Sequence, residues 1–276
     1  MSLELLLKHR ETWNSKPLLR FIYRTWYRDI TAHLTDGMSV ELCGGTGNLK
    51  EYESSVISTD LTLAPWLDAV VNAEALPFPE ASLSNIVLID GLHHIAKVCT
   101  FFEEACRALR TGGRIIILEP YLSPLSFPVY HFIHEEPVDF SRNPLDNESA
   151  KKGTLPFDAN QAVATILFEK DYHRFHRRFT LLEKTVHRHL LAWNYVLSGG
   201  FSHNQLIPTA VAKVLGSVKK IVPLPRRLLA FRLFVVLEKK QPAVRLSMRP
   251  DERETLQLSG QQPAFPVSRQ SAATGV

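Results

Sequence analysis

The spacing of apolar residues changes along this chain, and it predicts which segments are helices and which are strands. Near the N-terminus, Ile22, Trp26 and Ile30 recur every four positions, so they share one face of a helix. The apolar run at 86–90 has no such period and is typical of a strand that is covered on both faces. The pattern therefore predicts amphipathic helices combined with buried strands.

The same spacing, followed along the rest of the chain, predicts alternating elements. Strands are expected at 38–43, 56–59, 69–72, 86–90, 114–119, 202–209 and 231–238. Helices are expected at 3–34, 101–109, 161–197 and 210–220. The connections after the first two strands are too short for full crossover helices, so we expect one helical turn or a loop in each.

The composition changes twice in the second half of the chain. Residues 120–160 are rich in proline, aromatic residues and histidine, which indicates a cap inserted over the edge of the sheet. Residues 241–276 hold few large apolar side chains and are expected to form a disordered tail. The predicted parts are an N-terminal helical segment (1–37), an α/β domain (38–240) with a cap at about 121–197, and the tail (241–276).

The overall composition excludes several classes of protein. At 276 residues and 45% hydrophobic content the chain is globular, and no apolar run reaches the ~18–20 residues that span a bilayer. Three cysteines form no disulfide framework and the N-terminus makes a poor signal peptide, so we predict a cytoplasmic protein. The formal charge is +4, and its basic excess at 170–188 and 213–240 indicates either solvated helix faces or a surface for an acidic substrate or a membrane.

The strongest chemical signal is a glycine-rich turn between two apolar strands. Residues 40–48 run from a strand into Gly44, Gly45 and Gly47, and Asp60 ends the next strand. Glycines let the backbone approach a ligand closely, and a carboxylate at a strand end accepts hydrogen bonds from ribose hydroxyls. This arrangement predicts a nucleotide-like ligand across the end of a parallel sheet.

Four segments between about residues 38 and 120 together resemble the class I S-adenosylmethionine (SAM)-dependent methyltransferases, in particular the small-molecule group that includes ubiquinone/menaquinone-type enzymes. The segments are Glu41-Leu42-Cys43-Gly44-Gly45-Thr46-Gly47, Asp60, Asn72-Ala73-Glu74-Ala75-Leu76-Pro77-Phe78, and Asp90-Gly91-Leu92-His93-His94-Ile95 with the following Arg107–Arg114 and Glu119-Pro120. The resemblance implies an α/β fold with a Rossmann-like, seven-stranded, mostly parallel sheet between helices. It also implies an antiparallel last strand, an N-terminal helical segment and the cap between strands five and six.

The resemblance also implies the cofactor, SAM, and a role for each matching residue. The methionine end would be held by Glu41, Cys43, Gly45 and Gly47; the ribose and adenine by Asp60, Leu61, Asn72 and Ala73; and the sulfonium would lie beside Asp90 and Gly91. Two positions depart from the family pattern, because Cys43 replaces a glycine and Asn72 replaces an acid. They keep open a protein that binds SAM without catalysis and serves as a regulatory or partner subunit.

Catalytic residues are harder to predict, because a sulfonium methyl is already activated and the enzyme mainly aligns the acceptor. A base is needed when the acceptor must lose a proton, and the candidates are His94, His131 and Glu135. If 129–136 is helical, His131 and Glu135 share a face as a histidine–carboxylate pair. No group of residues has the spacing of a recognisable zinc site, so we predict no metal.

The acceptor is predicted from the cap, whose aromatic and apolar residues suit a small apolar, lipid-like, glycolipid or natural-product molecule. We expect methylation of a hydroxyl, with carbon and nitrogen as alternatives. The segment 222–229 mixes apolar and basic residues and is either a peripheral membrane contact or an ordinary connection. An NAD-dependent oxidoreductase is disfavoured by Leu76-Pro77-Phe78 and Gly112-Gly113, and a nucleic-acid enzyme by the absence of a strongly basic stretch.

Overall fold

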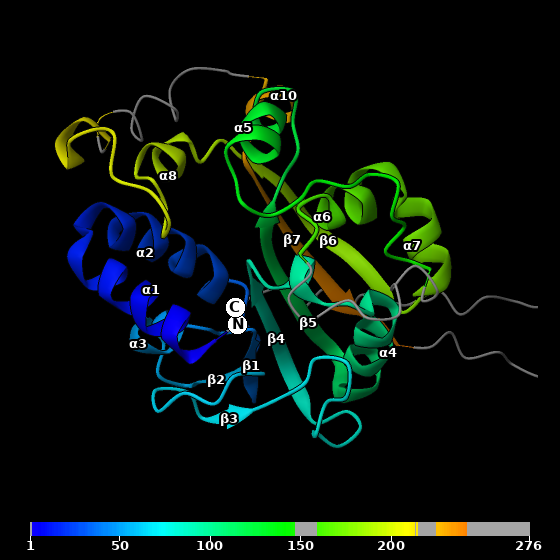
Figure 1. The fold of residues 1–276 in the computed structure, drawn as a ribbon. Helices are drawn as coiled ribbons and strands as arrows, with labels where there is room; N and C mark the ends of the chain where they lie inside the picture. Colours follow the sequence, from blue (N-terminus) through cyan, green and yellow to red (C-terminus); the bar gives the residue numbers. More distant parts are fainter. Residues whose placement is uncertain (1, 147–158, 213, 215–224, 242–276) are drawn as a thin grey trace, which may run out of the picture. The chain divides into compact units, whose positions relative to one another are not determined.

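A seven-stranded sheet forms the centre of the computed structural model, which describes residues 2–146, 159–212, 214 and 225–241. The strand order is β3-β2-β1-β4-β5-β7-β6 (Figure 1). The strands are β1 (Ser39–Leu42), β2 (Val56–Asp60), β3 (Ala69–Val70), β4 (Leu83–Ile89), β5 (Leu109–Pro120), β6 (Leu182–Leu190) and β7 (Arg232–Lys239). The expected Rossmann-like, mostly parallel sheet is confirmed.

The strands are parallel over most of the sheet and antiparallel at the end that holds β7 and β6. Strands β1 to β5 pair in parallel, whereas β7 is antiparallel to both of its neighbours, with Ile117 opposite Val235 on one side and His187 opposite Val235 on the other. The first two crossovers are short, as predicted: only the five-residue α3 (Asn48–Tyr52) follows β1, and no helix follows β2 among the described residues. The carboxyl ends of β1 and β4 therefore meet at one edge of the sheet.

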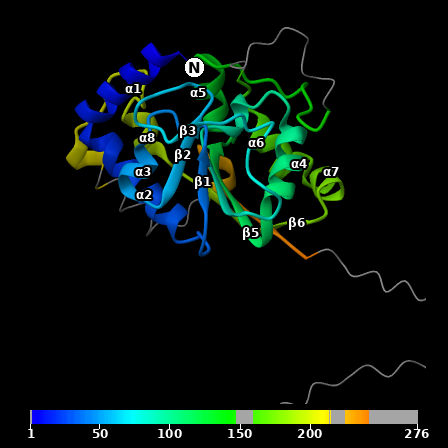
Figure 2. The same cartoon turned by 90° about the horizontal axis from the view of Figure 1, so that it is seen from below.

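Helices cover both faces of the sheet (Figures 1 and 2). One face carries α1 (Leu3–Ser15), α2 (Pro17–Thr31), α3 and α8 (Trp193–Leu197). The other carries α4 (Val98–Ala108), α6 (Val163–Thr165), the π-helix η3 (Ile166–Lys170) and α7 (Tyr172–Arg178). Three short helices are η1 (Leu92–His94), α5 (Ser126–Phe132) and α10 (Arg226–Leu229).

Each face of the sheet has its own apolar core. The predicted stripe of Ile22, Trp26 and Ile30 is buried in one core, against Phe234 of the sheet. Phe102 and its neighbours on α4 and α7 fill the other core. No helix among the described residues has both the length and the apolar character to cross a membrane.

Two predicted elements are wrong, and both lie in the second half of the chain. Part of the predicted helix 161–197 is the strand β6, Leu182–Leu190, and the predicted strand 202–209 is irregular. Strand β6 lies at the edge of the sheet, and most of its residues are only half-buried on both faces, so its sequence lacks the apolar alternation of a strand. The region between the fifth and sixth strands therefore ends at residue 181.

Smaller differences concern segment ends. Helix α5 ends at Phe132, so 129–136 is not one helix and His131 and Glu135 do not share a helical face. Gly112 and Gly113, which follow the predicted helix 101–109, form a bulge inside β5, where pairing shifts from Leu83 opposite Leu109 to Asn85 opposite Arg114. Most of the predicted helix 210–220 and residues 242–276 of the predicted tail lie outside the described residues.

Candidate active site

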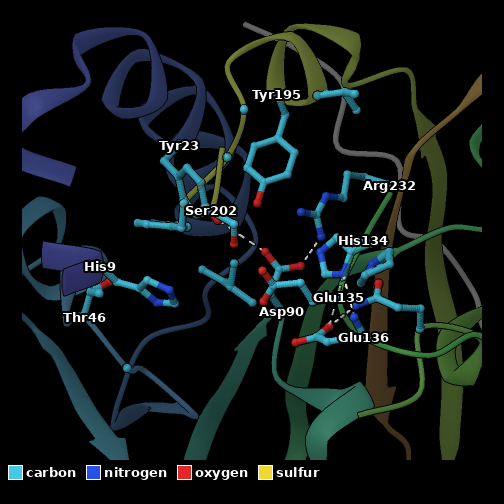
Figure 3. Close-up of a pocket in the computed structure, with 18 of the residues that line it drawn as sticks. His9, Tyr23, Thr46, Asp90, His134, Glu135, Glu136, Tyr195, Ser202 and Arg232 are labelled. Carbon is cyan, nitrogen blue, oxygen red and sulfur yellow. Dashed lines mark hydrogen bonds and ion pairs between the residues drawn. The ribbon is translucent and has the colours of Figure 1, made fainter. Parts of the chain in front are cut away.

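A cavity of about 550 Å³ opens at the carboxyl ends of β1 and β4. Ligands of open parallel sheets bind at such an edge, beyond the strand ends. The cavity wall comes from α1, α2, the glycine turn, η1, the segment after α5, the segment after α8, and the first residue of β7. Figure 3 shows how side chains from these separate segments converge on one space.

The glycine turn forms one end of the cavity. Glu41 ends β1, is 4% exposed and accepts a hydrogen bond from the Ser58 hydroxyl at 2.6 Å. Burial raises the pKa of Glu41 to about 8, although the Ser58 hydroxyl opposes the shift. A Cβ on Gly44 would lie 2.5 Å from the Ser58 oxygen and 2.8 Å from the Glu41 carboxylate, so only glycine fits there.

Two acceptors on this wall fit the ammonium group at the methionine end of SAM. The Asn48 side-chain oxygen is buried and has no hydrogen-bond partner, and Asn48 lines the cavity. A buried acceptor without a partner is costly, so a ligand ammonium that donates to it would remove the cost. Glu41 lies in the same wall, and a bound cation would favour the ionised form of its carboxyl group.

Asp60 and Trp66 hold the turn from the other side. The Asp60 carboxylate accepts hydrogen bonds from the backbone amides of Gly45 (3.0 Å) and Thr62 (2.9 Å). The indole N–H of Trp66 donates to the Gly45 carbonyl at 2.8 Å, and a Cβ on Gly47 would lie 2.9 Å from the indole ring. The turn is therefore fixed before any ligand binds.

Asp90 and Arg232, both in the cavity wall, form an ion pair in which the arginine is buried and the carboxylate is partly exposed. Arg232 begins β7 and is 3% exposed; its guanidinium donates to the Asp90 carboxylate and lies 4.5 Å from the centre of the Tyr195 ring. Tyr23 donates to the other Asp90 oxygen at 3.3 Å. Figure 3 shows Asp90 between these partners. Residue 90 has a positive φ of 52°, a backbone strain that aims the carboxylate at the cavity.

A second group of charges, which we call the pocket cluster, comprises His93, His94, Glu119 and Glu136. The buried Glu119 accepts from the amides of Gly91 and Leu92 through one oxygen and contacts His93 Nδ1 at 2.5 Å through the other. His93 Nε2 lies 3.3 Å from Glu136, whose second oxygen lies 3.5 Å from His94 Nε2. The His93 and His94 rings lie 4.3 Å apart.

The pocket cluster gives its two histidines different pKa values. Burial alone would lower the pKa of His93, but the carboxylates of Glu119 and Glu136 outweigh it and raise this pKa to about 10. Burial and the charge of His93 lower the pKa of His94 to about 4. Burial alone would raise the pKa of Glu136, but its hydrogen bond to His93 and the charges of the neighbouring histidines lower this pKa to about 2. At neutral pH His93 is an imidazolium and His94 a neutral imidazole.

The structure brings together about half of the predicted site residues. Those that line the cavity are Glu41, Cys43, Gly45, Asp90, His94 and Glu135. Those outside the lining are Gly47, Asp60, Leu61, Asn72, Ala73, Gly91 and His131. Gly91 lies behind Cys43, since a Cβ there would lie 2.7 Å from the cysteine Cβ. His131 is exposed and its ring stacks on Phe127.

Three residues of the site were given no role by the sequence: Asn48, Glu119 and Arg232. Arg232 had the clearest signal, because a lone arginine precedes the apolar run of β7. A charge at the end of a buried strand needs a partner, and the sequence does not reveal that the partner is Asp90.

Comparison with known proteins finds similarity to methyltransferases. Residues 47–117 match a family described as a methyltransferase domain. The chain is 29% identical over 145 residues to the ubiquinone/menaquinone biosynthesis C-methyltransferase UbiE of Pasteurella multocida, a match that covers 42% of this chain and 54% of the relative. For the enzyme of the same name from Neisseria meningitidis the identity is 30% over 122 residues, covering 36% and 50%. The chain thus spans about half the length of the curated relatives it matches.

Two solved structures superpose on part of this chain. A SAM-dependent methyltransferase from Thermotoga maritima superposes with a TM-score of 0.48 at 15% identity, covering 81% of this chain and 91% of the other. Geranyl diphosphate C-methyltransferase from Streptomyces coelicolor gives 0.46 at 14% identity, covering 79% and 78%. The domain match at 47–117 begins at Gly47 and includes Asp60, Asn72, Ala73, Asp90 and Gly91, and it supports the predicted resemblance to class I SAM-dependent methyltransferases.

Proposed function

We propose that this chain, which carries a class I SAM-dependent methyltransferase domain, methylates a small apolar molecule inside the cavity described above. The observation that carries the proposal is the cavity wall itself. A glycine turn with two acceptors for a cation forms one part of the wall. A pair of histidines with different pKa values forms another. The methionine end of the cofactor and the acceptor would therefore meet in one space of about 550 Å³.

The cofactor residues follow from the wall and the motif together. Glu41 and Asn48 would accept from the ammonium group, and Gly45 would allow close approach of the backbone. The ribose and adenine would extend from the turn toward Asp60, Leu61, Asn72 and Ala73, and Gly47 and Gly91 would support the wall from behind. SAM, when bound, supplies a methyl group on a sulfonium whose leaving group is a neutral thioether.

The acceptor end of the cavity selects by shape and charge. Its aromatic residues are Tyr23, Tyr27, Tyr130, Tyr195 and Phe201. Glu135 and Glu136 add negative charge near Asp90, so a carboxylate or phosphate acceptor would be repelled. We propose an uncharged aromatic or lipid-like molecule that carries a hydroxyl group.

Apolar side chains at the cavity favour a lipid-like acceptor. Ile133 and Leu206 both line the cavity and are 61% and 71% exposed. Phe132, the last residue of α5, is 77% exposed. Large apolar side chains that remain in contact with water mark a surface where an apolar partner binds. Such a surface would suit entry of the acceptor from a peripheral membrane contact.

His94 is the residue we propose as general base. Its ring lines the cavity, and its pKa near 4 keeps it neutral at physiological pH, with a lone pair for the hydroxyl proton. Such a low pKa makes it a weak base, so it would accept the proton only as the methyl group is transferred and the hydroxyl becomes acidic. The Glu136 carboxylate, 3.5 Å from His94 Nε2, would stabilise the imidazolium that forms. Glu119 and the protonated His93 hold Glu136 in place from the other side.

The test is transfer of a labelled methyl group from SAM to a panel of uncharged phenols, quinols and lipid alcohols, with matched acids alongside. We expect product with at least one uncharged hydroxyl acceptor and none with the acids. Glu41→Gln should lose SAM binding and product together, whereas Glu11→Gln, on an exposed part of α1, should lose neither. Tight SAM binding without turnover on any acceptor would favour a non-catalytic, regulatory protein instead.

A further inference from the structure

We propose that Glu169, His187 and His189 bind a divalent transition-metal ion, with Zn²⁺ the best match to their side chains. These three residues, which we call the edge cluster, lie between strand β6 and the π-helix η3. None of them lines the cavity of the proposed active site. The site would therefore be independent of cofactor and acceptor binding.

Local structure brings the three side chains together. His187 and His189 are two positions apart on a strand, so both imidazoles leave the same face of the sheet. That face is the one where Leu233 and Val235, which lie opposite them on β7, pack into the core with α4 and η3. Glu169 comes from η3, and π-helical turns are rare and concentrate at functional sites.

The distances approach those of a preformed metal site. Oε1 of Glu169 lies 2.9 Å from Nε2 of His187 and 2.6 Å from Nε2 of His189. The nearest ligand atoms of all three residues lie within 4.8 Å of one another. Ligands of a tetrahedral zinc ion at bond lengths of ~2.0–2.2 Å lie ~3.3–3.5 Å apart. An ion would therefore need only a small outward movement of each side chain.

Hydrogen bonding does not account for the whole arrangement. Nε2 of His187 is buried and makes no hydrogen bond, even though the Glu169 oxygen is only 2.9 Å away. Its contact with the carboxylate is therefore an ion-pair contact without hydrogen-bond geometry, and a metal ion between the two residues would use the lone pair of this nitrogen. Arg227, which is 73% exposed, faces the other Glu169 oxygen at 3.3 Å and leaves Oε1 directed at the histidines.

The ligand types favour zinc and suggest what the ion does. Two imidazoles and one carboxylate bind Zn²⁺ with a fourth position left to water, and they also suit Fe²⁺ or Co²⁺. The ion would link the edge strand β6 to the π-helix η3. Leu190, next to His189, lies opposite Arg232, so this link would also fix the strand that supplies the buried arginine of the cavity.

The experiment measures zinc by mass spectrometry and by competition with a chromophoric zinc chelator, on full-length protein that carries no affinity tag. After removal of metal and titration with Zn²⁺, we expect one tightly bound ion per chain and a higher Tm. The His187→Ala/His189→Ala double variant should bind at least ~100-fold more weakly, since even outer-shell changes cost 10–100-fold. Glu169→Gln should also weaken binding while keeping a side chain of the same shape.

Two controls make the result decisive. His173→Ala removes an exposed histidine of α7, and His94→Ala removes one from the pocket cluster; both should keep one zinc ion per chain. If the double variant is unfolded by circular dichroism, Glu169→Gln alone decides the question. The proposal is overturned if the wild-type chain binds no zinc at micromolar concentration, or if Glu169→Gln binds as tightly as wild type.

Discussion

The pocket cluster and the edge cluster contain the same kinds of side chain but differ in charge balance. Each brings two histidines and a glutamate within 4.8 Å of one another. In the pocket cluster a further buried carboxylate, Glu119, contacts His93 Nδ1. His93 is therefore protonated at neutral pH, whereas His94 is neutral. In the edge cluster one carboxylate, Glu169, faces two histidines and Arg227. The first arrangement suits proton chemistry, and the second suits a metal ion.

The largest expected difference between the two clusters is in stability. His93→Ala leaves the fully buried Glu119 without its cation and should lower the free energy of unfolding by about 3–5 kcal/mol. In metal-free protein, His187→Ala should cost about 1 kcal/mol or less, because that side chain is partly exposed. Urea unfolding followed by circular dichroism measures both. Equal losses of unfolding free energy in the two variants would contradict the difference in charge balance between the two clusters.

The second difference concerns pH. The pKa of His93 is about 10 in the folded state and near 6.5 in the unfolded chain. The unfolded state therefore loses its proton first, and this stabilisation is complete below pH 6.5 and disappears as the pH rises through 10. Stability should fall by a few kcal/mol over that interval, and His93→Gln should flatten the curve. An unchanged curve in His93→Gln would assign the pH dependence to other groups.

The third difference is catalytic. His94→Ala should reduce kcat by about 10²-fold with unchanged SAM affinity, because a base typically contributes 10²–10⁴-fold. His173→Ala, an exposed histidine of α7, should turn over at the wild-type rate. With saturating SAM, the wild-type kcat should fall only as the pH approaches the His94 pKa of about 4. If His131→Ala lost a comparable share of kcat, the base would be His131, as predicted from the sequence.

The smallest effect is a proton exchange at the glycine turn. Glu41 has a pKa of about 8, so at pH 7 it is mostly protonated and must ionise to pair with an ammonium group. SAM binding should therefore release up to about one proton, and its affinity should rise with pH up to about 8. Calorimetry in buffers of different ionisation enthalpy measures the release. Glu41→Gln should abolish it, and release that persists in this variant would come from another residue.

The parts of the molecule that the sequence predicts well are those with local signals. The helical stripe of α2, the buried β4 and the glycine turn each depend on residues close together in the chain. Strand β6 was missed because an edge strand that is half-buried on both faces lacks alternation. The prediction of no metal depended on sequence spacing alone. His187 and His189 carry a short-range signal, but their partner Glu169 is separated from them in sequence and joined only by the fold.

The same contrast applies within the proposed active site. Glu41, Gly45 and Asp90 belong to a contiguous motif and line the cavity as expected. The pair of His131 with Glu135 assumed a helix that ends at Phe132, four residues before Glu136. The partner of Asp90 is Arg232, which is 142 positions away, and no spacing rule could have joined them.

Titration calorimetry of the purified chain with SAM, S-adenosylhomocysteine and NAD tests the central claim most directly. We expect micromolar binding of the first two, no binding of NAD, and loss of binding in Gly45→Val, because residue 45 has a left-handed φ of 47° that a β-branched side chain does not adopt. Circular dichroism confirms that the variant is folded. Binding of NAD in place of SAM, or SAM binding that survives in Gly45→Val, would contradict the assignment of this cavity.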